Sequence, residues 1–144
     1  MANRTDTGDG WADSMIEGTF LFRQVNPSWV QDGHITSQVF KPTAKDNKRL
    51  SVYDGDRINA ENSWKHYTKS LGYESVGVLA VTVAECERED LSVESDPTPF
   101  PEHAVIDFTG IAESEMKRKA KRLKAAAESR GWLYQAAASY YSKQ

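Results

Sequence analysis

The stretch SVGVLAVTV, residues 75–83, decides the fold. Val76, Val78, Leu79 and Val81 make it a nearly continuous apolar run that is rich in β-branched side chains. Runs of this kind are typical of strands that are buried within a sheet. We therefore expect residues 75–83 to form a buried strand.

The segment that precedes this strand has the pattern of an amphipathic helix. Asn59 can cap its first turn, because an asparagine side-chain oxygen accepts one of the free amide protons there. Trp64, Tyr67 and Leu71 then recur at helical spacing, and Gly72 suits the end of a helix. We expect a helix from Asn59 to about Leu71.

The segment that follows the strand is acidic. Residues 85–96 hold six carboxylates and one arginine, and prolines follow at positions 97, 99 and 101. We expect this segment to lie outside the core. It contains Cys86 between Glu85 and Glu87, whose charges disfavour the reactive thiolate, so we do not expect Cys86 to act as a nucleophile.

The C-terminal third is predicted to contain a strand over residues 103–108 and one long helix from Ala112 to about Arg130. Gly131 suits the end of that helix, and residues 132–134 begin a short strand or a second helical piece. Within the long helix one narrow apolar stripe recurs at helical spacing, formed by Met116, Ala120, Leu123 and Ala127.

The N-terminal half is predicted to hold a polar, mobile arm over residues 1–17 and three further strands. The strands are expected at residues 19–25, 34–40 and 50–53, where β-branched and aromatic side chains gather or alternate with polar ones. A helical turn is expected at residues 28–30, between the first two strands.

These elements predict a single α+β domain over residues 18–144. Strands and helices mix without the regular alternation of a doubly wound sheet. We expect a compact, mostly antiparallel sheet, covered on one side by the two main helices. No apolar run approaches the roughly 20 residues that a membrane span needs, and the N-terminus lacks a signal-peptide pattern, so we expect a cytosolic protein.

Charge is divided unevenly along the 144 residues, whose net charge is -3. Residues 1–110 carry a net charge of -8 and residues 111–144 a net charge of +5. Six cations fall within eight residues of the long helix: Lys117, Arg118, Lys119, Lys121, Arg122 and Lys124. This basic cluster could be a solvated surface, could dock on the acidic 85–96 segment, or could bind a protein or nucleic-acid phosphates.

Three short patches resemble the Arg, Ser and Glu-x-Glu order of ADP-ribosyltransferases. They are Arg23, the step Thr36-Ser37-Gln38, and Glu85-Cys86-Glu87. The resemblance implies that Arg23 holds the phosphates of a nicotinamide dinucleotide, that Ser37 braces the site, and that Glu87 steers the ribose.

Residues 21–56 also resemble a small bacterial family of uncharacterised proteins, through RQVNP at 23–27, SQVFKP at 37–42 and LSVYDGD at 50–56. Loops held by a scaffold often carry function, so these turns indicate where a site would lie. Ordinary turn chemistry is the alternative for the two aspartates, which flank Gly55. The candidate residues are Arg23, Ser37, Lys41, Tyr53, Asp54 and Asp56.

Known catalytic motifs are missing from the sequence. It has no phosphate-binding loop, dinucleotide fingerprint, nucleophile elbow or calcium loop, and its histidines, at positions 34, 66 and 103, would meet only through the fold. We expect no cofactor and no metal site.

We therefore expect a non-catalytic accessory or interaction protein of the bacterial cytosol, binding a protein partner through the basic helix. One alternative is a small nucleotide- or NAD-handling enzyme that resembles ADP-ribosyltransferases. The other is a nucleic-acid-binding module. The binding residues expected on the basic helix are Lys117, Arg118, Lys121, Arg122 and Lys124.

Overall fold

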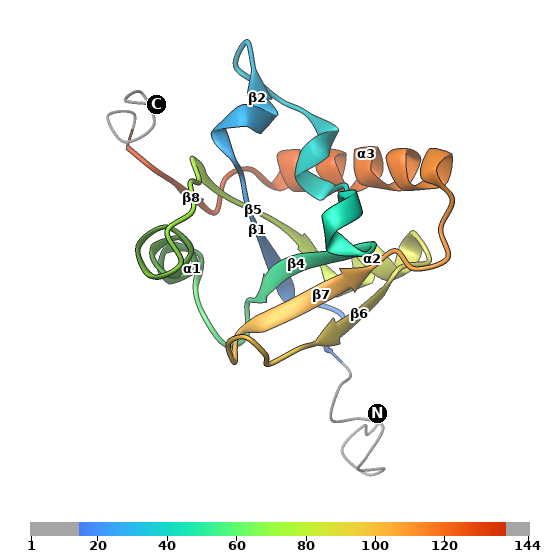
Figure 1. Ribbon diagram of the computed structural model, residues 1–144, viewed down its shortest axis with the longest axis horizontal. Coiled ribbons are helices and arrows are strands. Elements are labelled where there is room, and N and C mark those ends of the chain that lie inside the picture. The colour runs from blue at the N-terminus through green and yellow to red at the C-terminus, as the bar shows by residue number, and fades with distance from the viewer. Residues whose placement is uncertain (1–14, 138–144) are drawn as a thin grey trace.

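The computed structural model describes residues 15–137 and shows a six-stranded sheet with helices on it (Figure 1). The strand order is β6-β7-β4-β1-β5-β8, and each neighbouring pair is antiparallel. The predicted α+β class is therefore confirmed. The strands are β1 Phe20–Gln24, β4 Arg49–Asp54, β5 Gly77–Thr82, β6 Ser92–Ser95, β7 His103–Asp107 and β8 Tyr134–Gln135.

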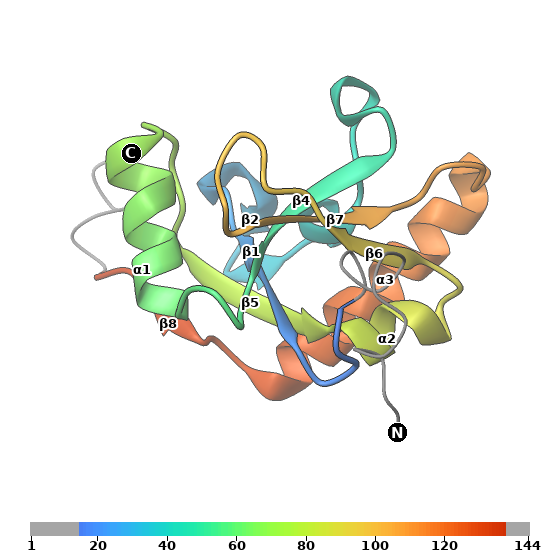
Figure 2. The ribbon, with the colours of Figure 1, turned by 90° about the horizontal axis from the view of Figure 1, so that it is seen from below.

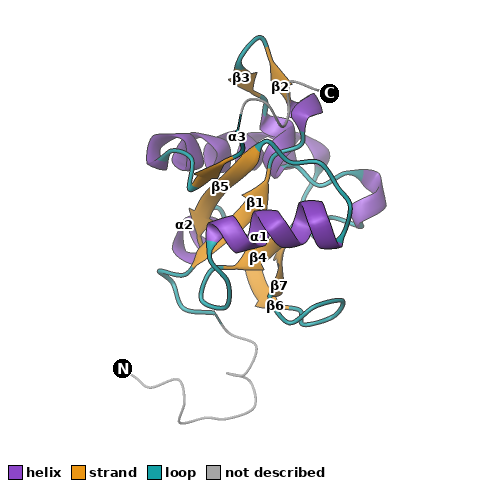
Figure 3. Cartoon of the chain, turned by 90° about the vertical axis from the view of Figure 1, so that its left-hand side faces the viewer, coloured by secondary structure: helices purple, strands orange, loops and turns teal. Residues whose placement is uncertain are grey.

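Strand β5 is buried on both of its faces. Val78 and Ala80 belong to one apolar cluster and Leu79 and Val81 to another, because successive side chains of a strand point to opposite sides. Helix α3 (Glu113–Arg130) covers the second face and helix α1 (Ala60–Lys65) the first, as Figure 3 shows with α1 in front of the strands and α3 behind. The expectation that both helices lie on one side is wrong.

Helix α3 packs through the predicted stripe. Met116, Ala120, Leu123 and Ala127 are all buried, and the two alanines leave room for the helix to lie close to the sheet. Burial of Leu123 alone contributes about 2 kcal/mol. The helix ends at Gly131, whose amide bonds to the Ala127 carbonyl and whose φ of 91° suits glycine.

Helix α1 begins as predicted and ends in an unusual way. The Asn59 side chain accepts a hydrogen bond from the Asn62 amide at 2.7 Å. After Lys65 the chain continues as a π-helical turn, η6 (His66–Ser70), before Gly72. Below α1, buried polar side chains bond to one another: Gln24 donates to Ser63 and accepts from Ser75.

The predicted strand over residues 34–40 is wrong after Ile35. Strands β2 (Val30–Gln31) and β3 (His34–Ile35) form a separate small hairpin, preceded by the short 3₁₀ helix η3 (Pro27–Trp29). The chain then forms a second 3₁₀ helix, η4 (Ser37–Phe40). In η4 the consecutive residues Val39 and Phe40 both enter the core, which a strand would not allow, because its neighbouring side chains point apart.

The expectation that residues 85–96 stay outside the core is also wrong. This segment contains helix α2 (Val83–Arg88) and strand β6, and both Cys86 and Leu91 are buried. The cause is amphipathicity, since the apolar side chains turn inward while Glu87 and Arg88 remain exposed. A capping box between Thr82 and Glu85 starts the helix.

Most of the predicted N-terminal arm, residues 1–14, lies outside the described residues, as do residues 138–144. Met15 packs against the core, and the Glu17 carbonyl accepts a hydrogen bond from the Ala84 amide. Within residues 15–137, none of the helices combines the length and the apolar character that crossing a membrane requires.

Candidate functional site

A cleft opens where strands β1 and β4 separate. The two strands pair only at Leu21 with Asp54 and at Phe22 with Tyr53, and then diverge. The resulting cleft has a volume of about 770 Å³, within the range of small-molecule sites. Its aromatic lining consists of Phe22, Trp29, Tyr53, Tyr67, Tyr73 and Phe100.

Arg23 spans the gap between the two strands. Its Nε donates to the Val39 carbonyl at 2.6 Å and its Nη1 to the Ser51 carbonyl at 2.8 Å, while its guanidinium lies 5.1 Å from the centre of the Trp29 ring. An arginine has five N–H donors. Within the described part of the chain, the other three have no bonded acceptor. Arg23 therefore offers free donors to the cleft.

The charge of Arg23 is retained. Burial lowers the pKa of the guanidinium, but the nearby Tyr67 and Asp46 oppose that shift. Arginine in proteins stays protonated in any case, because its ordinary pKa lies far above neutrality. The Asp46 carboxylate is itself engaged, since it accepts hydrogen bonds from the amide and hydroxyl of Thr43.

Beside Arg23 the cleft has a rigid aromatic wall. The Tyr53 ring stacks on Phe100 at 5.1 Å, and His66 meets Phe100 edge-on at 4.6 Å. The Tyr53 hydroxyl is 2.8 Å from Nδ1 of His66. Burial raises the pKa of Tyr53, so this hydroxyl stays neutral. In Figure 2 the gold loop that carries Phe100 stands on the same side of the sheet as α1.

A serine, a histidine and an aspartate meet at another part of the cleft lining. His103 Nε2 lies 3.0 Å from the Ser51 hydroxyl. His103 Nδ1 lies 2.9 Å from the Asp96 carbonyl oxygen and 3.6 Å from its carboxylate. Arg49 Nη2 forms an ion pair with the same carboxylate at 3.9 Å. The serine is exposed, whereas the imidazole is buried.

The rim of the cleft is apolar and exposed. Leu71 and Tyr73 present large side chains to solvent there, and Tyr67 comes from the π-helical turn η6. π-helical turns occur frequently at functional sites. Asn47 and Lys48, which follow the lining residue Asp46 in the chain, both have positive φ, a conformation that also concentrates at functional sites.

The structure brings two of the sequence-predicted candidates, Arg23 and Tyr53, together in the cleft. Asp54 and Asp56 instead show the turn chemistry that was the alternative for them. Asp54 accepts from the Asp56 amide and pairs with Arg57 at 3.3 Å. Lys41 forms an ion pair with Glu113 at 2.7 Å.

The three residues of the ADP-ribosyltransferase resemblance do not line one cleft. Arg23 is in the aromatic cleft, whereas Ser37 is the first residue of η4 and Glu87 is exposed on α2. Because Arg23, Ser37 and Glu87 are far apart in the sequence, the sequence alone does not show whether they meet in the folded chain.

The basic cluster of α3 is partly occupied by the chain itself. Lys119 donates to the carbonyl of Glu89, and Arg122 pairs with the carboxylate of the same residue at 2.9 Å. Lys124 donates to the Ile35 carbonyl at 3.0 Å. Arg118 pairs with Glu115 on its own helix at 3.1 Å. The acidic segment 85–96 thus neutralises part of the basic cluster through Glu89, which was one of the three interpretations of the cluster.

The Cys86 thiol is unreactive, because it stays protonated near neutral pH. Burial raises the pKa of its thiol to about 12, and the neighbouring Glu85 and Glu87 add to the effect. The sequence-based expectation that Cys86 is a poor nucleophile has the right direction, but burial contributes more than the two charges.

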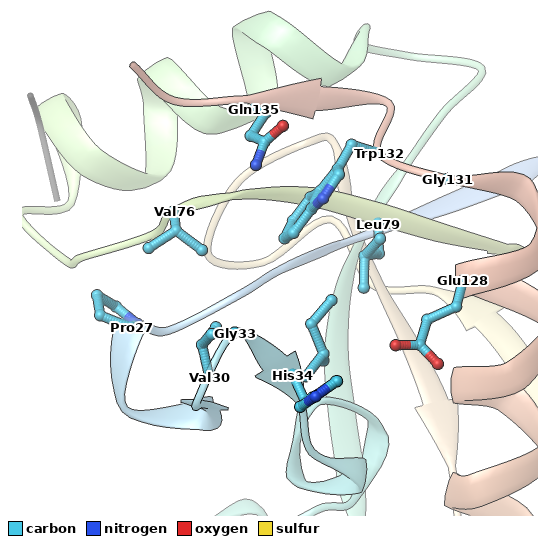
Figure 4. A pocket seen from close by; sticks show the side chains of 11 residues that line it. Pro27, Val30, Gly33, His34, Val76, Leu79, Glu128, Gly131, Trp132 and Gln135 are labelled. Atoms are coloured by element: carbon cyan, nitrogen blue, oxygen red, sulfur yellow. The ribbon is translucent and has the colours of Figure 1, made fainter. Parts of the chain in front are cut away.

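A second cavity, of about 610 Å³, lies between the β2–β3 hairpin, β5 and the end of α3. Figure 4 shows Trp132 between β8 and β5, and Glu128 projecting from α3 toward the cavity. Gly77 makes room for this arrangement, since a Cβ there would lie 2.9 Å from the Trp132 ring. The sequence-predicted site residues are not among those that line this cavity.

Sequence reasoning missed Ser51, His103, Asp96 and Phe100 as members of one site. The signal was too weak, because these residues come from different strands and loops and no short motif joins them. The prolines at 97, 99 and 101 indicated the loop that carries Phe100, but not the contact of Phe100 with His66 at the start of η6.

Within residues 15–137, no group of three His, Cys, Asp or Glu side chains is arranged to hold a metal ion. Comparison of the chain with protein-family models, with curated proteins and with solved structures finds no match.

Proposed function

We propose that this protein is a ligand-binding domain whose aromatic cleft accepts a planar ring that carries an anionic group. The observation that supports it is Arg23, a charged side chain with free N–H donors inside a cleft lined by aromatic rings. A guanidinium of this kind binds a carboxylate or phosphate through two parallel hydrogen bonds.

The cleft supplies both parts of such recognition. Its aromatic side chains offer faces and edges on which a planar ring stacks, at about 0.5–1.5 kcal/mol for each aromatic pair beyond area burial. Lys45 adds a second cation on the rim. A mononucleotide and an aromatic carboxylate both combine a ring with an anion, so both belong to the proposed class.

A thermal-shift and calorimetry series tests this proposal by separating the two parts. We expect adenosine monophosphate or 4-hydroxybenzoate to raise the melting temperature, and adenosine alone or inorganic phosphate alone to raise it much less. A ligand at 100 times its dissociation constant stabilises the fold by about 2.7 kcal/mol. If none of these compounds binds, the proposal is wrong.

The matched variants are Arg23→Lys and Arg118→Lys. The first keeps a positive charge in the cleft but removes the planar fork, so we expect at least about a tenfold loss of affinity, which is 1.4 kcal/mol. The second makes the same replacement on the exposed face of α3 and should leave affinity unchanged. Equal affinity in both variants would show that Arg23 does not contribute to ligand binding.

A second candidate function is partner binding through α3, because part of its basic cluster remains at the surface. Lys117 and Lys121 are exposed one helical turn apart, and neither has an ion-pair partner among the described residues. Together with Arg118 they form a cationic patch that would attract an acidic protein surface.

Retention of partners from a native lysate at low and at high salt tests this candidate. Reversing Lys117 and Lys121 to glutamate should abolish retention of a protein, with Lys65→Glu on α1 as the control. Failure of the wild type to retain any macromolecule at low salt would reject the candidate, and recovery of nucleic acid alone would assign the patch to phosphates.

A further inference from the structure

We propose that the cleft also carries out acyl transfer, with Ser51 as nucleophile, His103 as its general base and Asp96 as the residue that orients the imidazole. The three side chains come from β4, β7 and the loop between β6 and β7, and all line the cleft. This inference rests on the proposed function to the extent that the substrate's ring occupies the same cleft.

The hydrogen bonds of His103 define the direction of proton transfer. The Asp96 carbonyl oxygen can only accept, so Nδ1 of His103, at 2.9 Å, carries the proton. In a neutral imidazole the other nitrogen, Nε2, then has a free lone pair. That nitrogen is 3.0 Å from the Ser51 hydroxyl, which must donate to it. This is the arrangement of a serine activated by a histidine base.

The positions of the two residues are set by rigid elements. In the β4–β7 ladder Tyr53 lies opposite His103 and Ser51 lies opposite Val105, so Ser51 and His103 are diagonal neighbours on one face. The reciprocal backbone bond from the Asp96 amide to the His103 carbonyl, at 2.9 Å, holds the orienting residue in place. Ser51 is exposed, as a nucleophile must be to meet its substrate.

The surroundings also supply positive charge for the transition state. Arg23 donates to the backbone carbonyl of Ser51 and lines the same cleft, so a guanidinium with free N–H donors is available to a substrate bound at Ser51. Such donors stabilise the negative oxygen that forms when a hydroxyl attacks a carbonyl. The Asp96 carboxylate, 3.6 Å from Nδ1, would stabilise the imidazolium that forms at the same time.

The reaction proceeds in two balanced halves. Ser51 Oγ attacks the carbonyl carbon of an ester, and its proton moves to Nε2 of His103. The tetrahedral intermediate collapses, the bond to the alcohol oxygen breaks, and the leaving alcohol takes the proton from Nε2. Water then attacks the acyl-serine with the same base, releasing the acid and restoring Ser51. The substrate class is an ester whose alcohol or acyl part is a planar aromatic ring.

Labelling with diisopropyl fluorophosphate, followed by intact-mass measurement and peptide mapping, tests the nucleophile. The expected result is one adduct per chain, on Ser51, with none on Ser51→Ala. Ser92→Ala, which removes another exposed serine from a strand of the same sheet, should be labelled like the wild type. No adduct, or an adduct at another residue, would overturn the inference.

Hydrolysis of 4-nitrophenyl acetate tests the base. We expect kcat to fall by about 10²–10⁴-fold in His103→Gln, the usual contribution of general-base catalysis. Circular dichroism and the melting temperature show whether that variant is folded. If the variant does not fold, the Ser51→Ala variant alone decides, since it should lose turnover to the background rate. Turnover equal to the wild type in Ser51→Ala would overturn the inference.

The experiments can reject the binding proposal and the catalytic proposal independently of each other. The fluorophosphate is small and needs only the serine and its base, whereas stabilisation by adenosine monophosphate or 4-hydroxybenzoate needs only the ring site and Arg23. Stabilisation without an adduct would reject catalysis and keep binding. An adduct without stabilisation would reject the ring site and keep the nucleophile.

Discussion

The two faces of the sheet are built on different principles. The face under α3 is closed by aliphatic side chains, with Leu79 and Leu123 fully buried. The face under α1 has fewer aliphatic residues, more aromatic rings and a buried polar network that includes Gln24. The first face stabilises the domain mainly by aliphatic packing, whereas the second adds a buried hydrogen-bonded network beneath α1.

The lengths of the helices account for much of this difference. Helix α3 has 18 residues, so it extends for about 27 Å. Helix α1 has only 6 residues before its π-helical turn, and it leaves the diverging ends of β1 and β4 uncovered.

The largest expected effect is on the α3 face. Leu123→Ala should lower the free energy of unfolding by about 2–5 kcal/mol, because it removes a fully buried side chain and leaves a void in the packed core between α3 and the sheet. Urea unfolding measures the loss. Tyr73→Ser on the cleft rim, where the side chain is 58% exposed, should change stability by less than about 0.5 kcal/mol. Equal losses in the two variants would contradict the contrast between the faces.

The next effect concerns the ion pair that joins α3 to α2. Arg130 Nη2 donates to Glu85 at 2.7 Å, and the Thr82 amide donates to the same carboxylate. Burial alone would raise the pKa of Glu85, but these bonds outweigh it and the pKa is lowered. The pair therefore stabilises the fold above the ordinary glutamate pKa of about 4.3, and this contribution is lost as pH falls through the lower folded value.

Glu85→Gln should accordingly cost about 1.5–3 kcal/mol at pH 7. The difference from the wild type should shrink when urea unfolding is repeated below the ordinary glutamate pKa of about 4.3, because the unfolded chain then binds a proton that the folded Glu85 carboxylate, with its lowered pKa, binds only at lower pH. Glu87→Gln, on the exposed side of α2, is the control. A difference that is constant between the two pH values would show that the charge of Glu85 is not responsible.

A smaller effect is expected on the aromatic wall of the α1 face. Tyr53→Phe keeps the ring stacked on Phe100 but removes the hydroxyl that lies 2.8 Å from His66, so unfolding should become easier by about 1 kcal/mol. Tyr134→Phe is the control, as Tyr134 packs on the same face without a side-chain hydrogen bond in the described structure. Denaturant titration that finds no difference would mean that the hydroxyl bond is energetically neutral.

The smallest effect is expected on the solvent side of α3. Lys121→Met should change stability by less than about 0.5 kcal/mol, because Lys121 is exposed. Lys119→Met should cost about 1 kcal/mol, because it removes the buried bond to the Glu89 carbonyl. Both measurements use the same denaturant titration, and a reversed order would contradict the assignment of Lys119 to the interior.

The local elements were largely predictable from the sequence. The apolar run of β5, the Asn59 cap of α1 and the stripe of α3 each depend on neighbouring residues, and each appears as expected. The exceptions are η4, where tertiary packing outweighs local preference, and α2, whose capping box and amphipathic pattern are local signals that the expectation of an exposed segment overlooked. Val39 and Phe40, for example, both gain burial by leaving the extended conformation.

The cleft could be predicted only in part. Arg23 and Tyr53 stood out in the sequence, yet their meeting with Ser51, Asp96, Phe100 and His103 depends on contacts between distant segments. The sequence by itself determined which segments are apolar, which are charged and where chains turn, because those properties reside in consecutive residues. Only the tertiary structure decided that the helices cover opposite faces and that a cleft stays open, because strand order and register place residues from distant segments side by side.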